Sequence, residues 1–318
     1  MRIVSLLPAA TEWIAAFGAE DDLVGRSHEC DTPASVQDVP VVTAPTYANG
    51  GDSAALDAAV QTQLQQGLSL YEVDLERLRA LEPDLILTQA QCEVCAVSLP
   101  QLEDALADWS GRAPDILSME PMTLKAVLDV ALRIGRTIGR AEMAMQVVAA
   151  KERALKRLRN RMGVGRRTDP ETLPTIACIE WMEPLMTAGH WMPDVAEMAG
   201  GRAVLAEKGA PSQTIEWEAL RATDPDVVAV MPCGFALEET RRDLHYLTER
   251  DGWDELQAVQ NDRVVLLDGN AYFNRPGPRL YRSIELLAEA LHPAAADTAA
   301  LSIESWERQR LQDATAVS

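Results

Sequence analysis

Side chains that could bind a metal ion follow predicted strands in both halves of this 318-residue chain. Thiolate sulfur and neutral imidazole are ligands that zinc prefers in proteins, and four thiolates can also hold an iron–sulfur cluster. Four of the five cysteines and two of the four histidines follow apolar runs, at Cys30, Cys92, Cys95, Cys233, His28 and His190. The four cysteines are therefore candidate metal ligands, and His28 could replace one thiolate.

Two other interpretations of the cysteines stay open. Cys92-Glu-Val-Cys95 has the spacing of a redox pair as well as that of half a metal site. Two thiols packed at the start of a helix would give the same pattern. The fifth cysteine, Cys178, lies inside a predicted strand, where a small apolar side chain is expected to pack in the core.

Aromatic residues gather in loops that follow the predicted strands of the second half, although only 5% of the chain is aromatic. They are Trp181, Trp191, Phe235, Tyr272 and Phe273. A wall of rings suits a broad, partly apolar ligand, and the alternative is that the rings seal the end of a sheet. The other candidate ligand-binding residues in strand-end loops are Pro8, Ala9, His28, Glu29, Gln89, Glu183, His190, Asn274 and Arg275. Arg275 could bind an anionic group or pair with an acid.

Short apolar runs bounded by Pro, Asp or Gly predict the buried parallel strands that would position these loops. The runs are Ile3 to Leu7, Leu23 to Gly25, Val39 to Val42, Leu85 to Thr88, Ile116 to Met119, Thr175 to Glu180, Val227 to Met231 and Val264 to Leu267. Helical patterns between them, such as 11–17, 75–81 and 217–222, predict an α/β fold with right-handed crossovers. Ligands of such sheets bind at the carboxyl ends of the strands.

A helix-turn-strand unit occurs twice, 142 positions apart. The first copy reads VDLERLRALEPDLIL at 73–87, and the second reads IEWEALRATDPDVVA at 215–229. A repeat at about half the chain length predicts two similar α/β lobes. We expect lobes at 1–120 and 166–293, connecting helices within 121–165, and a tail at 294–318.

The connecting segment predicts two helices, at 123–138 with Thr123 as N-cap and at 141–162. The second contains no Pro or Gly and would span about 30 Å. A flexible hinge would be rich in Gly or Ser. We therefore expect one long rigid helix to join two Rossmann-like parallel-sheet lobes.

The balance of 49 acidic against 29 basic residues gives a net charge of −20. This excess argues against binding to nucleic acid or to an anionic membrane, since both need basic patches. The apolar start contains Glu12 and predicts a strand and a helix better than a signal peptide, and no run is apolar enough for membrane insertion. We expect a cytoplasmic protein; the alternative is a periplasmic or cell-surface protein whose true start lies upstream.

Several motifs resemble one protein family over residues 2–293. RIVSLLPAATE at 2–12 and LRALEPDLIL at 78–87 resemble the helical-backbone (class III) solute-binding proteins of ABC importers, which have the Fe/B12 periplasmic-binding domain. The motifs that resemble the branch labelled cobalamin-binding are GRSHECDTP, TQAQCEVCAVS, AGHWMP, PCGF and DGNAYFNRPGPRL. The resemblance implies a ligand cleft between two lobes that move little.

We therefore expect a non-enzymatic binding protein for a metal-containing ligand, first of all cobalamin or a related corrinoid. One alternative is a zinc or iron–sulfur protein with a redox or enzymatic role on the same scaffold. The other is an exported receptor that delivers its ligand to an ABC permease.

Overall fold

The computed structural model describes residues 1–46, 51–66, 69–89, 112–164 and 168–293, the single positions 102, 106 and 109, and a strand at 306–308. The chain divides into two compact units. Unit 1 comprises residues 1–51, 55–121 and 125–150, and unit 2 comprises residues 52–54, 122–124 and 151–318.

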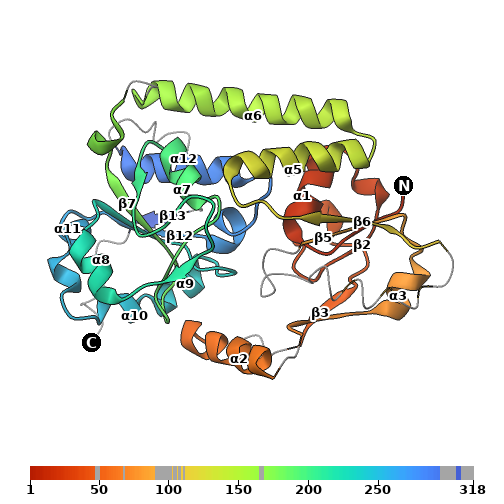
Figure 1. The fold of residues 1–318 in the computed structure, drawn as a ribbon, viewed down its shortest axis with the longest axis horizontal. Helices are drawn as coiled ribbons and strands as arrows, with labels where there is room; N and C mark the ends of the chain where they lie inside the picture. The colour runs from red at the N-terminus through yellow and green to blue at the C-terminus, as the bar shows by residue number, and fades with distance from the viewer. Residues whose placement is uncertain are drawn as a thin grey trace. The chain divides into compact units, whose positions relative to one another are not determined.

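The sheet of unit 1 has four parallel strands in the order β2-β1-β5-β6 (Figure 1). Their bounds are Leu23–Arg26 for β2, Ile3–Ser5 for β1, Leu85–Gln89 for β5 and Asp115–Met119 for β6. The helices of this unit are α1 (Pro8–Ala16), α2 (Ser53–Gln65) and α3 (Leu75–Ala80). All five residues of β5 are buried, as expected for a central strand covered on both faces.

One predicted strand of unit 1 is wrong. Val41 forms only an isolated bridge with Arg26, because Pro40 has no N–H and the ladder stops after two backbone hydrogen bonds. The chain instead continues into β3 (Thr43–Pro45), which pairs antiparallel with β4 (Tyr71–Val73) outside the main sheet.

Unit 2 has a central parallel core of β7 (Thr175–Trp181), β11 (Val227–Val230) and β12 (Val264–Leu267). Short strands extend it: β8 (Met186–Thr187), β9 (Arg202–Ala203), β10 (Gln213–Thr214) and β13 (Trp306–Arg308). Figure 1 shows α7 (Met192–Met198) and α12 (Leu280–Leu291) over one face of this sheet. The other face packs against α8 (Trp217–Thr223), α10 (His245–Thr248) and α11 (Gln257–Gln260), and α9 (Leu237–Asp243) lies near β12. The α/β fold class is confirmed.

The repeated sequence folds the same way in both units. Leu78 of α3 and Leu220 of α8 have no exposed surface, and Glu82 and Asp224 both take left-handed backbone angles, with φ of 41° and 43°. The aspartates of the two Pro-Asp turns also act alike. Asp84 accepts a hydrogen bond from the backbone N–H of Arg2 at 2.8 Å, and Asp226 accepts one from Thr175 N–H at 2.7 Å. Each turn therefore fixes the start of the neighbouring central strand.

Two helices follow the first sheet, α5 (Leu124–Thr137) and the 21-residue α6 (Ala141–Arg161). A β-carbon on Gly135 would lie 2.3 Å from that of Ala144, so only glycine allows the two helices to pack this closely. The division between the units falls within α6, after Ala150.

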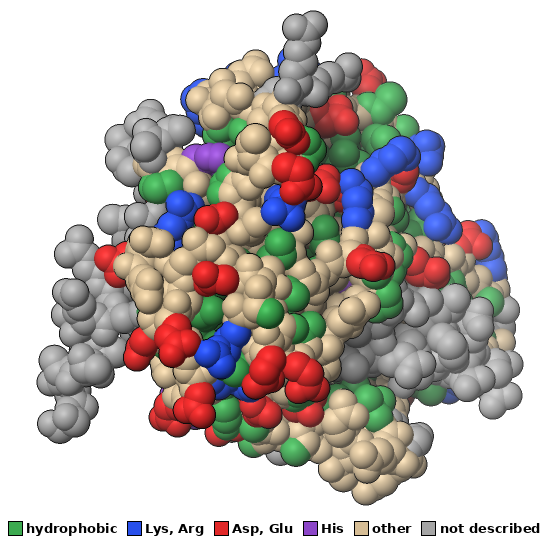
Figure 2. All heavy atoms as spheres, turned by 60° about the vertical axis from the view of Figure 1, so that its left-hand side comes forward, with side chains coloured by type: hydrophobic (Ala, Val, Ile, Leu, Met, Phe, Trp, Pro, Cys, Tyr) green, Lys and Arg blue, Asp and Glu red, His purple; other side chains and the backbone are tan. Residues whose placement is uncertain are grey.

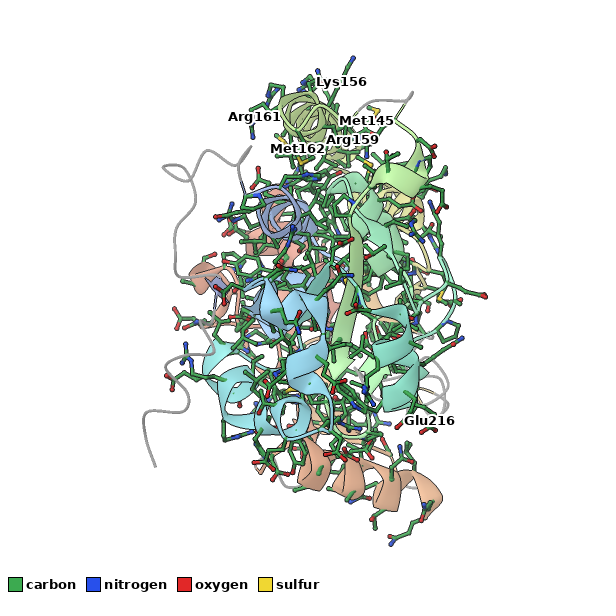
Figure 3. All side chains as sticks on the ribbon, turned by 90° about the vertical axis from the view of Figure 1, so that its left-hand side faces the viewer. Met145, Lys156, Arg159, Arg161, Met162 and Glu216 are labelled. Carbon is green, nitrogen blue, oxygen red and sulfur yellow. The ribbon has the colours of Figure 1, made fainter. Side chains whose placement is uncertain are left out.

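The second half of α6 has a basic exposed side. Lys156 and Arg161 lie there in the end-on view of Figure 3, whereas the guanidinium of Arg159 donates a hydrogen bond to the Glu197 carbonyl of α7 at 2.8 Å. Acidic side chains are scattered over the face shown in Figure 2, mixed with basic ones, as expected for solvated surface charge. Within the described ranges, no helix is both long and apolar enough to cross a membrane.

Candidate functional site

The loops after the three central strands of unit 2 are joined at one edge of its sheet. Cys233 N–H donates to the Glu180 carbonyl at 3.0 Å, which connects the loop after β11 with the end of β7. Asn270 N–H donates to the Phe235 carbonyl at 3.0 Å, which adds the loop after β12. The sequence therefore predicted correctly that these loops meet. We call this edge, with residues 180–183, 189–191, 231–235 and 268–275, the unit 2 edge.

The aromatic residues of the unit 2 edge differ in exposure. Phe273 has no exposed surface, and Phe235 and Trp191 are only 4% and 6% exposed, so these three rings pack the end of the sheet. The Trp191 indole N–H donates to the Phe273 carbonyl at 3.1 Å. Trp181 and Tyr272 are partly exposed, and the Trp181 ring lies 5.2 Å from that of Phe235. Of the five predicted rings, Trp181 and Tyr272 offer the most accessible surface to a ligand.

Two polar atoms of the unit 2 edge are buried without a hydrogen bond to any described residue. They are the indole Nε1 of Trp181, a donor, and the side-chain Oδ1 of Asn274, an acceptor. Asn274 lies against Gly269, where a β-carbon would come within 2.0 Å of the Pro232 carbonyl oxygen. Buried polar atoms without partners cost free energy until a partner is supplied.

The charged candidates of the unit 2 edge are bound within the unit. Arg275 is only 8% exposed, and its guanidinium donates to Asn270 Oδ1 at 2.7 Å. Glu183 forms an ion pair with Arg250 at 2.7 Å. These contacts favour a structural role for Arg275 and Glu183.

His190 has an unusual backbone. Its φ is 52°, in the left-handed region that β-carbons disfavour, and its N–H donates to the Ala210 carbonyl at 2.6 Å. Gly189 before it must be glycine, because a β-carbon there would lie 2.5 Å from the Pro211 carbonyl carbon. Burial lowers the pKa of the half-buried His190 ring, which favours neutral imidazole at neutral pH.

Sequence reasoning missed the pair formed by Glu180 and Ser212. The Ser212 hydroxyl contacts the Glu180 carboxyl and accepts a hydrogen bond from Gly189 N–H at 3.0 Å, so it connects β7 to the His190 turn. Burial raises the pKa of Glu180 to about 7. The signal was available, since an acidic residue ends the otherwise apolar run TIACIEW, but nothing in the sequence identifies its partner 32 positions later.

The predicted residues of unit 1 also lie at strand ends. Pro8 and Ala9 begin α1, and Gln89 is the last residue of β5. His28 Nδ1 is 2.8 Å from Thr43 Oγ1, and its Nε2 is 3.3 Å from the Glu29 carboxylate.

Cys30 is fully buried, and its sulfur accepts a hydrogen bond from the Thr11 hydroxyl at 3.0 Å. Cys178 is buried in β7, where burial raises its pKa to about 12, and Cys233 is partly exposed. Cys92 and Cys95 lie outside the described residues. The rest of the described chain contains no group of three His, Cys, Asp or Glu side chains placed to hold a metal ion.

The sequence pattern of the periplasmic binding protein family matches residues 3–271. The chain belongs to the periplasmic binding protein family. A vitamin B12-binding protein of Vibrio cholerae is 24% identical over 288 residues, which are 89% of this chain and 86% of that protein. An uncharacterized ABC transporter substrate-binding lipoprotein of Bacillus subtilis is 24% identical over 296 residues, which are 92% of this chain and 80% of the lipoprotein.

Solved structures of periplasmic binding proteins share the fold. A possible iron-binding (periplasmic solute-binding) protein of Staphylococcus epidermidis superposes with a TM-score of 0.67 at 20% identity, covering 92% of this chain and 98% of that one. Membership in this family confirms the resemblance seen in the motifs. It also confirms the expectation of a binding protein in preference to an enzyme.

Proposed function

We propose that this member of the periplasmic binding protein family is a non-enzymatic binding protein for a metal chelate, and that its preferred ligand is cobalamin or a related corrinoid. The observation that carries the proposal is the unit 2 edge, which combines partly exposed rings with a donor and an acceptor that lack partners among the described residues. The 24% identity to a vitamin B12-binding protein over 89% of the chain supports it.

The chemistry of a corrinoid fits this edge. Its flat macrocycle is broad and partly apolar, which suits the rings of Trp181 and Tyr272. Its rim carries neutral amide groups, each with a donor and an acceptor. These match in kind the donor Trp181 Nε1 and the acceptor Asn274 Oδ1, which are buried without partners among the described residues and would have to turn toward the ligand to meet it.

Charge distinguishes a corrinoid from haem, which is also a flat metal chelate. Haem carries two carboxylates, and a chain with net charge −20 repels them at long range. Arg275, the only arginine or lysine among the residues of the unit 2 edge, is already hydrogen-bonded to Asn270. The amides of a corrinoid meet no such repulsion.

Titration of the purified protein with cobalamin, followed by visible absorbance and by calorimetry, tests the proposal. We expect saturable one-to-one binding, with haemin bound more weakly. Trp181→Ala should weaken binding, whereas His245→Ala should not, because His245 is an exposed residue of α10 with its ring near Tyr246. Absence of heat and of spectral change at tens of micromolar cobalamin would contradict the proposal.

A second proposal concerns the partner. The name of the Bacillus subtilis relative, a substrate-binding lipoprotein of an ABC transporter, supports delivery of the ligand to an ABC permease. Cell fractionation tests this, because such a receptor must be outside the cytoplasm. The cytoplasmic location expected from the sequence remains a competing prediction, and recovery of the protein only in the cytosolic fraction would favour it.

The names of these relatives do not support a zinc or iron–sulfur protein. Metal analysis of anaerobically purified protein tests that alternative. Stoichiometric zinc or iron that is lost in Cys92→Ala would favour it.

A further inference from the structure

The backbone that carries the His190 ring is held in place by hydrogen bonds. Both backbone groups of His190 are fixed, because its N–H donates to Ala210 and its carbonyl accepts from Gly209 N–H at 3.1 Å. The turn before it is fixed by the hydrogen bond from Gly189 N–H to Ser212 Oγ. Residues with a β-carbon that are forced into the left-handed region are found mostly where the surroundings over-determine them, and they concentrate at functional sites.

His190 also differs from the other three histidines in what its ring contacts. A ring nitrogen of each other histidine lies at hydrogen-bond distance from an oxygen of the protein. His28 Nδ1 contacts Thr43 Oγ1, His245 Nδ1 contacts the Arg242 carbonyl, and His292 Nε2 contacts the Gly200 carbonyl. Neither ring nitrogen of His190 has a hydrogen-bond or ion-pair partner among the residues that the structure describes; its ring contact is with Trp191, at 5.7 Å between centroids.

The position of His190 brings its ring to the unit 2 edge. Trp191, the next residue, is tied through its indole N–H to the Phe273 carbonyl in the loop after β12. The turn at His190 is tied through Ser212 to Glu180 at the end of β7. The one histidine whose ring nitrogens lack a hydrogen-bond or ion-pair partner among the described residues therefore belongs to the edge with the accessible rings.

We propose that His190 is an axial ligand to the metal ion at the centre of the bound chelate. The inference rests on the proposed function and adds to it one coordinating residue and one ligand class, a flat metal chelate with an exchangeable axial position. In aquocobalamin that position holds water. The metal–water bond breaks, the imidazole lone pair forms a metal–nitrogen bond, and the water leaves; no electron is transferred.

The experiment compares two corrinoids on the wild-type protein. Aquocobalamin should bind with a shift of its visible absorption bands, because nitrogen replaces oxygen on cobalt. Cyanocobalamin, whose cyanide holds the same axial position more firmly, should bind at least about tenfold more weakly and without a shift. This comparison needs no variant and so does not depend on how a substitution folds.

A variant pair then assigns the effect to His190. Asparagine tolerates left-handed backbone angles, so His190→Asn should keep the turn and remove only the imidazole. We expect His190→Asn to lose the spectral shift and to reduce the affinity for aquocobalamin at least about tenfold, to that for cyanocobalamin. His245→Asn, on α10, is the matched control and should behave like wild type.

The outcomes separate the inference from the function on which it rests. If wild type binds both corrinoids equally and without a shift, or if His190→Asn keeps the shift, His190 is not an axial ligand, while the binding function stands. If wild type binds neither corrinoid, both the function and the inference are wrong.

Discussion

Asp226→Ala should destabilise unit 2 by about 3 kcal/mol, because the Asp226 carboxylate holds the first residue of the central strand β7. One oxygen, Oδ2, accepts from Thr175 N–H at 2.7 Å and from the Thr175 hydroxyl at 2.8 Å. Hydrogen bonds to a charged group each stabilise by about 1.5–3 kcal/mol, and the partial exposure of both residues places these two at the lower end.

The repeat supplies the matched control. Asp84 is the equivalent residue of unit 1, but it is exposed and accepts a single hydrogen bond, from Arg2 N–H. Asp84→Ala should therefore cost only about 1 kcal/mol.

Urea denaturation measures both effects. Tryptophan fluorescence reports mainly on unit 2, because that unit contains five of the seven tryptophans. They are Trp181, Trp191, Trp217, Trp253 and Trp306. Circular dichroism follows both units, so any separate transition of unit 1 is also seen. Equal losses of stability in Asp226→Ala and Asp84→Ala would refute the assignment of the larger contribution to the double hydrogen bond with Thr175.

Three further predictions concern the unit 2 sheet and its edge. Burial raises the pKa of Glu180 from 4.5 to about 7, so the free energy of unfolding should fall by up to about 3 kcal/mol as pH rises through this range. In urea denaturation, Glu180→Gln should therefore be more stable than wild type at pH 8 but not at pH 4. An equal difference between the two proteins at both pH values would contradict this. Gly189→Ala should lower the free energy of unfolding by about 2–3 kcal/mol, seen as a lower melting temperature, because the new β-carbon would lie 2.5 Å from the Pro211 carbonyl carbon. An unchanged melting temperature would show that the turn at 189–190 can shift to accept the β-carbon. Iodoacetamide at pH 8 should label the partly exposed Cys233 and leave Cys178 unmodified, because burial raises the Cys178 pKa to about 12. Peptide mass spectrometry identifies the labelled cysteines. Equal labelling of both would contradict the burial of Cys178 in the core of unit 2.

Most of the α/β framework could be predicted because buried parallel strands leave a strong pattern. The runs at 85–88, 175–180 and 264–267 agree with β5, β7 and β12 to within one residue at each end. Strands of two residues, such as β8 and β10, are too short to have a pattern. The run from 39 to 42 was assigned wrongly as a strand, because apolar composition does not tell which edge a segment pairs with, and Pro40 ends the ladder there.

The site was predictable at a coarser level. Topology alone brings the loops after β7, β11 and β12 to one edge, so their residues could be named from the sequence. Composition could not say which rings are accessible, and it did not distinguish the buried Phe273 from the partly exposed Tyr272 beside it. The left-handed turn at His190 also has no sequence signal of its own, because its cause is the packing of Gly189 against a segment more than twenty positions later.

The two units share a framework but differ in how the polar groups at their strand ends are used. In the described part of unit 1, His28 and Cys30 both have partners within the unit, in Thr43 and Thr11. At the unit 2 edge, His190 and the unpaired atoms of Trp181 and Asn274 lack such partners among the described residues. Substitutions that remove a partnered group, as at Thr43, should change stability more than ligand binding. If the proposed function is correct, substitutions at His190 or Trp181 should change ligand binding more than stability, because the proposal assigns the ligand as the partner of these polar groups.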